Sequence, residues 1–131
     1  MDYLRGRPER KVTQPQKQVR VEVPSDSLFE TFAQKAFDMF TPDQRAWLYT
    51  EFLNEQIISV LKDDDLYQCI EAFFKNNLNV AETSRNAFLH RNTLLYRIDK
   101  IHKLTGLNIR NFEDAITFKL LAKIYNRMNY R

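Results

Sequence analysis

Residues 79–101 read NVAETSRNAFLHRNTLLYRIDKI, and this stretch decides the fold. Asn79 is suited to cap a short helix beginning at Val80, because its side-chain oxygen can accept a backbone N–H one turn in. A second helix is expected to begin near Arg91. The expected inner faces carry Val80, Ser84 and Ala87 in the first helix, and Leu94, Ile98 and Ile101 in the second. The stretch therefore predicts a helix-turn-helix.

The outer face of the second helix carries side chains suited to base edges and phosphate oxygens. They are Arg91, Asn92, Arg97 and Lys100. His90 directly precedes this helix, and Thr93 lies at the edge of its outer face. A solvated surface helix usually alternates charge signs, but the only carboxylates between residues 79 and 101 are Glu82 and Asp99. This pattern favours nucleic-acid binding over an ordinary solvated face. A helical protein-protein interaction module without DNA binding is the main alternative.

The same residues resemble a known family. The core HRNTLLYR at residues 90–97, followed by LTG at residues 104–106, resembles the C-terminal DNA-binding domain of the PucR/CdaR family of bacterial transcription regulators. The resemblance begins weakly near Leu66 and extends to about Ala122. A looser similarity to the nucleoid protein Fis covers the same two helices. The resemblance implies sequence-specific binding of double-stranded DNA by a helix-turn-helix, in a transcription regulator or its DNA-binding domain.

The resemblance also implies roles for individual residues. The expected DNA-binding residues are His90, Arg91, Asn92, Thr93, Tyr96, Arg97 and Lys100, with Arg85 and Lys103 as possible phosphate contacts. Arg91 and Asn92 are the best candidates for base contact, because Arg suits guanine and Asn suits adenine. His90 and Thr93 would add a base or phosphate contact at the entrance. The remaining residues would lie nearer the phosphates.

Charge is unevenly distributed along the 131 residues. Residues 1–24 carry six Lys/Arg against three Asp/Glu (+3), residues 25–74 carry three against ten (−7), and residues 75–131 carry eleven against four (+7). A basic C-terminal part beside an acidic central part is expected when one end of a protein meets phosphate. The chain is long enough for one domain, or for one domain with a tail.

Glycine and proline are too rare to punctuate strands and hairpins. The chain has two glycines and four prolines, and every proline precedes Asp43. The composition therefore predicts an all-α fold: a small helical bundle of about five to six helices that contains the helix-turn-helix. The chain has no signal-peptide pattern at its start and no apolar run of membrane-spanning length. The single cysteine, Cys69, suits a reducing cytoplasm. The family resemblance implies that this is a bacterial cytoplasm, with the protein associated with the nucleoid.

No enzymatic chemistry is expected from the sequence. It shows no pairing of nucleophile and base, no paired carboxylates in an apolar setting and no phosphate-binding glycine loop. Cys69, His90 and His102 lack the spacing of metal ligands, so neither a metal nor a cofactor is expected.

Three segments are expected along the chain. Residues 1–24 should form a flexible basic arm, or a linker. Residues 25–64 should form an N-terminal helical pair, one helix from residue 28 to about 40 and one from 42 to about 61. Their apolar side chains cover more surface than one neighbouring helix can bury, which favours a homodimer over a monomer core. Residues 65–131 should form the DNA-binding domain.

Within the third segment, further helix ends are predicted by capping residues. Asp65, with Gln68, is expected to cap a helix from residue 66 to about 75. Gly106 should end the second helix of the helix-turn-helix in a left-handed conformation. Asn111 should cap a last helix whose inner face carries Ile116, Leu120, Leu121 and Ile124.

Partners other than DNA are less defined by the sequence. Members of the family usually carry a sensory domain upstream, and nothing before Asp26 is long enough to be one. The chain is therefore expected to be a fragment of a larger regulator or a short regulator that receives its signal through the N-terminal helices.

Overall fold

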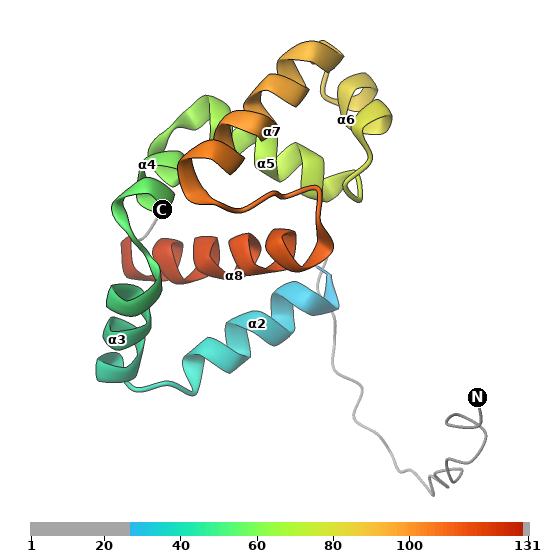
Figure 1. Cartoon of the computed structure of the whole chain (residues 1–131). Helices are drawn as coiled ribbons and strands as arrows, with labels where there is room; N and C mark the ends of the chain where they lie inside the picture. Colours follow the sequence, from blue (N-terminus) through green and yellow to red (C-terminus); the bar gives the residue numbers. More distant parts are fainter. Residues whose placement is uncertain (1–26, 130–131) are drawn as a thin grey trace, which may run out of the picture. The chain divides into compact units, whose positions relative to one another are not determined.

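The computed structural model describes residues 27–129 (Figure 1). The chain divides into two compact units, residues 1–35 and 36–131, and the predicted basic arm lies outside the described residues. Seven helices are present in residues 27–129: α2 (Leu28–Asp38), α3 (Pro42–Phe52), α4 (Glu55–Lys62), α5 (Asp64–Lys75), α6 (Val80–Asn86), α7 (Arg91–Thr105) and α8 (Phe112–Asn129). This part of the chain contains no strand, so the predicted all-α fold is confirmed, with one helix more than expected.

The first unit contributes only the beginning of α2 to the described residues. The hydroxyl of Ser27 accepts a hydrogen bond from the N–H of Glu30 (3.2 Å), which is the predicted start of this helix. Ala33 is buried, whereas Leu28 and Phe32 are exposed. The helix ends at Asp38, slightly before the predicted end near residue 40.

The predicted single helix over residues 42–61 is wrong, because the chain turns between α3 and α4. Helix α3 begins with a capping box: the Thr41 hydroxyl accepts from the N–H of Gln44 (3.1 Å), and the Gln44 side chain accepts from the N–H of Thr41 (2.9 Å). Leu53 is extended and buried, and the Asn54 side chain then accepts from the N–H of Ile57 (2.9 Å). Asn54 therefore caps a new helix where the apolar pattern alone continues uninterrupted.

Helix α5 begins two residues earlier than predicted. Asp63, not Asp65, is its cap, because the Asp63 carboxylate accepts a hydrogen bond from the N–H of Leu66 (3.1 Å). The inner face of α5 carries Leu66, Cys69, Ile70 and Phe73, all buried. Phe74, next to this face, is half-buried.

The two ends of the α7–α8 connection follow the predicted caps. Gly106 has a φ of 82°, and its N–H donates to the carbonyl oxygen of His102 (2.8 Å). The Asn111 side chain accepts from the N–H of Asp114 (3.1 Å). The Asp114 carboxylate accepts in turn from the N–H of Asn108 (2.9 Å), which holds the connection against the start of α8.

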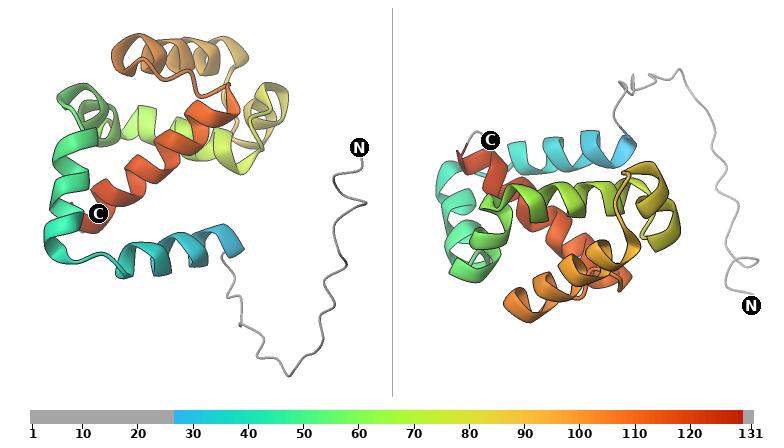
Figure 2. Two further views of the ribbon diagram at one scale, coloured as in Figure 1. Left: turned by 60° about the horizontal axis from the view of Figure 1, so that its bottom comes forward. Right: turned by 90° about the horizontal axis from the view of Figure 1, so that it is seen from above.

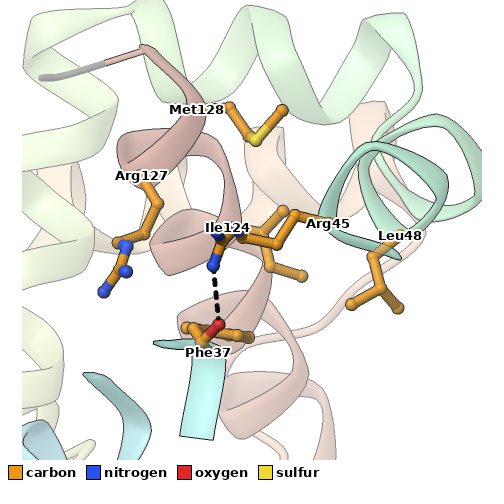
Figure 3. A pocket seen from close by; sticks show the side chains of 6 residues that line it. All are labelled: Phe37, Arg45, Leu48, Ile124, Arg127 and Met128. Atoms are coloured by element: carbon orange, nitrogen blue, oxygen red, sulfur yellow. Dashed lines mark hydrogen bonds between the residues drawn. The ribbon is translucent and has the colours of Figure 1, made fainter. Parts of the chain in front are cut away.

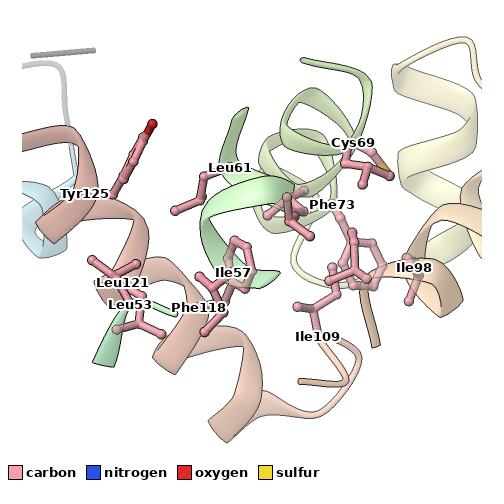
Figure 4. Packing of buried hydrophobic residues seen from close by; sticks show 14 of the residues in the cluster. Leu53, Ile57, Leu61, Cys69, Phe73, Ile98, Ile109, Phe118, Leu121 and Tyr125 are labelled. Carbon is pink, nitrogen blue, oxygen red and sulfur yellow. The ribbon is translucent and has the colours of Figure 1, made fainter. Parts of the chain in front are cut away.

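One hydrophobic cluster within the second unit joins residues from Leu53 to Tyr125 (Figure 4). Its largest fully buried side chains come from α4, α5, α7, α8 and the α7–α8 connection: Val60, Leu61, Phe73, Leu94, Ile101, Ile109 and Phe118. Each large apolar side chain buried in this way contributes roughly 1.5–3 kcal/mol. The helix-turn-helix therefore shares its core with α4 and α8.

The inner face of α8 differs in part from the predicted one. Leu121 and Ile124 are buried as expected, but Ile116 is only half-buried and Leu120 is 37% exposed. The buried stripe instead includes Ala115, Phe118 and Tyr125. These positions follow helical spacing from Leu121, so the stripe is rotated relative to the predicted face.

A small cavity lies where the end of α2 meets α3 and α8 (Figure 3). It is lined by Phe37, Arg45, Leu48, Ile124, Arg127 and Met128. Arg45 donates to the carbonyl oxygen of Phe37 (3.0 Å), and Arg127 forms an ion pair with Asp38. At about 10 Å³, the cavity has room for no more than one water molecule.

Candidate nucleic-acid interface

Helices α6 and α7 form the predicted helix-turn-helix and begin at the predicted residues. The Asn79 side chain accepts a hydrogen bond from the N–H of Glu82 (2.8 Å), so the predicted cap of α6 is confirmed. Helix α6 ends at Asn86, and α7 begins at Arg91. The four residues between the two helices make the turn that sets their angle.

The inner face of α6 differs from the predicted one at one position. Val80 is buried and Ser84 is half-buried as expected, but Ala87 is exposed and Thr83 is fully buried in its place. The Thr83 hydroxyl donates to the carbonyl oxygen of Asn79 (2.7 Å). Because this bond satisfies the hydroxyl within its own helix, Thr83 can lie in the core without an unpaired polar group.

Hydrogen bonds on both sides of Phe88 hold the turn. The N–H of Ala87 donates to the Thr83 carbonyl oxygen (2.9 Å), and the N–H of Leu89 donates to the Ser84 carbonyl oxygen (3.0 Å). The Ser84 hydroxyl also donates to the carbonyl oxygen of Leu89. Phe88 itself has a φ of 53° and is 94% exposed. The turn therefore has a fixed backbone with one aromatic side chain projecting into solvent.

Helix α7 is fixed to the core by its predicted inner face. Leu94, Ile98 and Ile101 are 0%, 3% and 0% exposed. His90 is the N-cap of α7, because its Nδ1 accepts from the N–H of Asn92 (3.0 Å). From the sequence, only a DNA-contacting role was expected for His90, and its capping role was not predicted. Its position just before the helix was the available signal, but histidine is not among the usual capping residues.

The outer face of α7 is solvent-exposed along its length. In both views of Figure 2, α7 lies at the edge of the second unit. Among the predicted DNA-binding residues, His90, Arg91, Asn92, Tyr96 and Lys100 are exposed, and Thr93 and Arg97 are half-buried. All seven therefore lie on or beside one continuous face of a single helix and its cap.

The predicted cations differ in whether a carboxylate neutralises them. Lys103 pairs with Asp99 (3.1 Å), and Arg85 pairs with Glu82 (3.5 Å). Within residues 27–129, no Asp or Glu lies within ion-pair distance of Arg91, Arg97 or Lys100. The two paired cations are the two that the sequence analysis ranked as weaker phosphate candidates. The outer face of α7 thus has three positive charges that form no ion pair with any residue from 27 to 129.

Arg97 also connects this face electrostatically to α5. Burial raises the pKa of the Cys69 thiol to about 11, and the positive charge of Arg97 acts against that rise. Cys69 is 3% exposed and lies in the hydrophobic cluster. The thiol is therefore neutral at physiological pH and packs as a small apolar side chain.

The geometry defines the class of this unit: a helix-turn-helix whose second helix presents an unpaired cationic face to solvent. Residues 66–124 match the PucR C-terminal helix-turn-helix domain, which confirms the resemblance found in the sequence. Among residues 27–129, no helix is both long and apolar enough to cross a membrane.

Curated relatives agree with the family match. The chain is 43% identical over 51 residues to the carbohydrate diacid regulator of Escherichia coli (strain K12), a match covering 39% of this chain and 13% of that protein. It is 24% identical over 63 residues to the purine catabolism regulatory protein of Bacillus subtilis (strain 168), covering 48% and 12%. The chain thus spans only a small part of these relatives. No solved structure shows significant similarity to it.

Proposed function

We propose that this chain binds double-stranded DNA sequence-specifically through α7, as a bacterial transcription regulator or as the DNA-binding domain of one. The observation that carries the proposal is the outer face of α7, where Arg91, Arg97 and Lys100 have no carboxylate partner among the described residues. The family of residues 66–124 and the names of the two relatives support it. Such a regulator would act in the bacterial cytoplasm, at the nucleoid.

The proposed contacts follow from position along α7. In a helix-turn-helix, the N-terminal residues of the second helix meet base edges in the major groove. Arg91 and Asn92, in the first turn, are therefore the proposed base-reading residues. Farther along the helix the groove wall brings phosphates close, and Tyr96, Arg97 and Lys100 are proposed to contact them, with Arg85 and Lys103 as secondary phosphate contacts.

Capping restricts what His90 can recognise. Its Nδ1 accepts the N–H of Asn92, so a neutral imidazole carries its proton on Nε2. His90 can then offer DNA only a donor, and its proposed partner is a phosphate oxygen or a guanine acceptor. Thr93, half-buried beside it, can donate or accept.

The test is duplex binding by variants of α7. We would select a bound duplex from random sequences and measure Kd for the parent and for the double variant Arg91→Ala/Arg97→Ala across a salt series. The parent is expected to lose roughly 10³ in affinity from low to moderate salt, since several phosphates are contacted. The double variant should bind at least ~10-fold more weakly, with a salt slope lower by about 1 for the lost Arg97 contact.

Lys62→Ala is the matched control, because Lys62 is an exposed cation at the end of α4. Its loss should leave both the affinity and the salt slope close to those of the parent. Unchanged binding by the double variant, or no binding by the parent at low salt, would contradict the proposal.

We further propose that the chain forms a homodimer through its N-terminal helices. Trp47 and Phe52 on α3 are 58% and 51% exposed, with ring centroids 6.1 Å apart in an edge-to-face arrangement. A helix-turn-helix dimer presents two recognition helices about one DNA turn apart, so that it contacts two half-sites of an operator at once. Sedimentation should give a dimer mass for the parent and a monomer mass for Trp47→Ser. A monomeric parent would contradict the dimer.

The same exposed side chains favour the second candidate function, a protein-protein interaction module that keeps the helix-turn-helix fold without DNA binding. A sensory domain upstream or a separate partner protein would then occupy this surface. The DNA measurements discriminate the two functions, since only the interaction module predicts no affinity for any duplex at low salt.

A further inference from the structure

Phe88 is not explained by the folding of the helix-turn-helix. At 94% exposed, it has the highest exposure of the large hydrophobic side chains among residues 27–129. A single exposed apolar side chain is common on protein surfaces and means little alone. Phe88 also has a φ of 53°, however, a left-handed conformation that glycine or asparagine adopts far more readily than a bulky residue. The residue thus neither fills the core nor suits its own backbone.

The position of this strained residue is fixed from both sides. The Leu89 N–H bonds to the Ser84 carbonyl oxygen, and the Ser84 hydroxyl bonds to the Leu89 carbonyl oxygen. On the other side, the Ala87 N–H bonds to Thr83. Strained residues held by their surroundings occur preferentially where a ligand is bound. The turn therefore presents the Phe88 ring at a defined place beside α7.

The fold places this ring close to the proposed DNA surface. Phe88 is three residues before Arg91, and three residues of chain span at most about 10 Å. If the start of α7 enters a major groove about 12 Å wide, the preceding turn lies beside the wall of that groove. Phe88 and Arg91 are both exposed, and Arg91 forms no ion pair among residues 27–129. An unpaired cation three residues from the ring favours a DNA strand as the occupant.

We propose that Phe88 is a DNA-contacting residue that packs against deoxyribose carbons at the edge of the groove entered by α7. This inference rests on the proposed function and adds an apolar contact to a set that is otherwise polar. Because the ring has no charge, the contact contributes affinity without neutralising a phosphate.

The experiment compares Phe88→Asn with Phe88→Tyr on the duplex selected by the parent. Asparagine suits the left-handed backbone and removes the ring, whereas tyrosine keeps the ring. Phe88→Asn should unfold at the same temperature as the parent or higher, bind about tenfold more weakly, and keep the parent's salt slope. Phe88→Tyr should bind within about twofold of the parent. Phe112→Asn, which removes a 70% exposed ring outside the helix-turn-helix, should not change binding.

Three results would overturn the inference. Binding by Phe88→Asn equal to that of the parent would show that the ring does not touch DNA, even if Arg91→Ala/Arg97→Ala abolishes binding and the proposed function stands. A lower unfolding temperature of Phe88→Asn together with weaker binding would show that Phe88 stabilises the fold and does not contact DNA. Failure of the parent to bind any duplex at low salt would remove the proposed function and this inference together.

Discussion

Cys69 shows how a single buried side chain responds to its surroundings. Its thiol is in the shared hydrophobic cluster, and burial raises its pKa to about 11, with Arg97 opposing the rise. In the unfolded chain the thiol ionises near its ordinary pKa of roughly 8.5. Between these values the unfolded chain has released a proton that the folded chain retains, so stability falls as pH rises.

This difference predicts a pH-dependent effect of Cys69→Ala. The contribution of the neutral thiol is fully present below about pH 8 and is lost by about pH 11. Each unit of difference between the folded and unfolded pKa corresponds to about 1.4 kcal/mol, so over that range the parent should lose roughly 3 kcal/mol more in unfolding free energy than Cys69→Ala loses. Urea denaturation at several pH values measures the unfolding free energy of the parent and of Cys69→Ala. Parallel pH profiles for the two proteins would contradict the assigned burial.

Thr83 provides a second prediction for a single residue. Thr83→Val keeps the shape of the buried side chain but removes the hydroxyl that donates to the Asn79 carbonyl oxygen. The carbonyl retains the N–H of Thr83 as a partner (3.0 Å), so the loss should be small, about 1 kcal/mol. Thr83→Ser keeps the hydroxyl and loses a methyl group, with a cost of similar size. Chemical denaturation of both variants tests this balance, and a neutral Thr83→Val would show that the hydroxyl contributes nothing.

The ends of the helices depend on one residue each. Gly106 ends α7 with a φ of 82°, and a Cβ built there meets nothing within 4 Å. Gly106→Ala should therefore lower the free energy of unfolding by about 1 kcal/mol through backbone strain alone. Gly106→Asn should cost less, because asparagine adopts this conformation more readily. Thermal unfolding of the pair measures the difference, and equal losses would point to a cause other than backbone conformation.

Three helix ends could be predicted from the sequence. Asn79, Gly106 and Asn111 act locally, and each caps where the pattern placed it. The break at Asn54 was missed because the apolar pattern of residues 42–61 continues through it, although asparagine is a usual capping residue. The buried Thr83 was missed because its hydroxyl bond is invisible in a pattern of apolar residues. The site residues were placed on one face from helical spacing alone, since α7 is a regular helix.

At the scale of the whole second unit, α4 belongs to the same core as the helix-turn-helix. Leu53, Ile57, Val60 and Leu61 are all buried in the cluster that includes Phe73 and Phe118. A fragment of residues 65–131 would lack these four side chains and expose the surfaces they cover. Each large side chain contributes roughly 1.5–3 kcal/mol, which is comparable to a large share of the stability of a small domain.

Truncation tests this packing. A fragment beginning at residue 65 should lose cooperative thermal unfolding, whereas a fragment beginning at residue 36 should keep it, because the cluster lies within residues 53–125. Calorimetry of the two fragments shows whether each one unfolds cooperatively. A cooperatively folded fragment of residues 65–131 would show that α4 is dispensable for the core, and it would support the predicted boundary at residue 64.

Through the shared hydrophobic cluster, DNA binding at α7 also affects α4, which lies outside the proposed DNA contacts. Free energy gained when a ligand binds the folded state is distributed over everything that unfolds with the binding site. Amide protons in α4 should therefore exchange with solvent more slowly when an operator duplex is added, provided that they exchange through opening of the whole unit. A regulator built in this way reports occupancy of its recognition helix to its N-terminal side through stability alone, without any displacement of one helix against another.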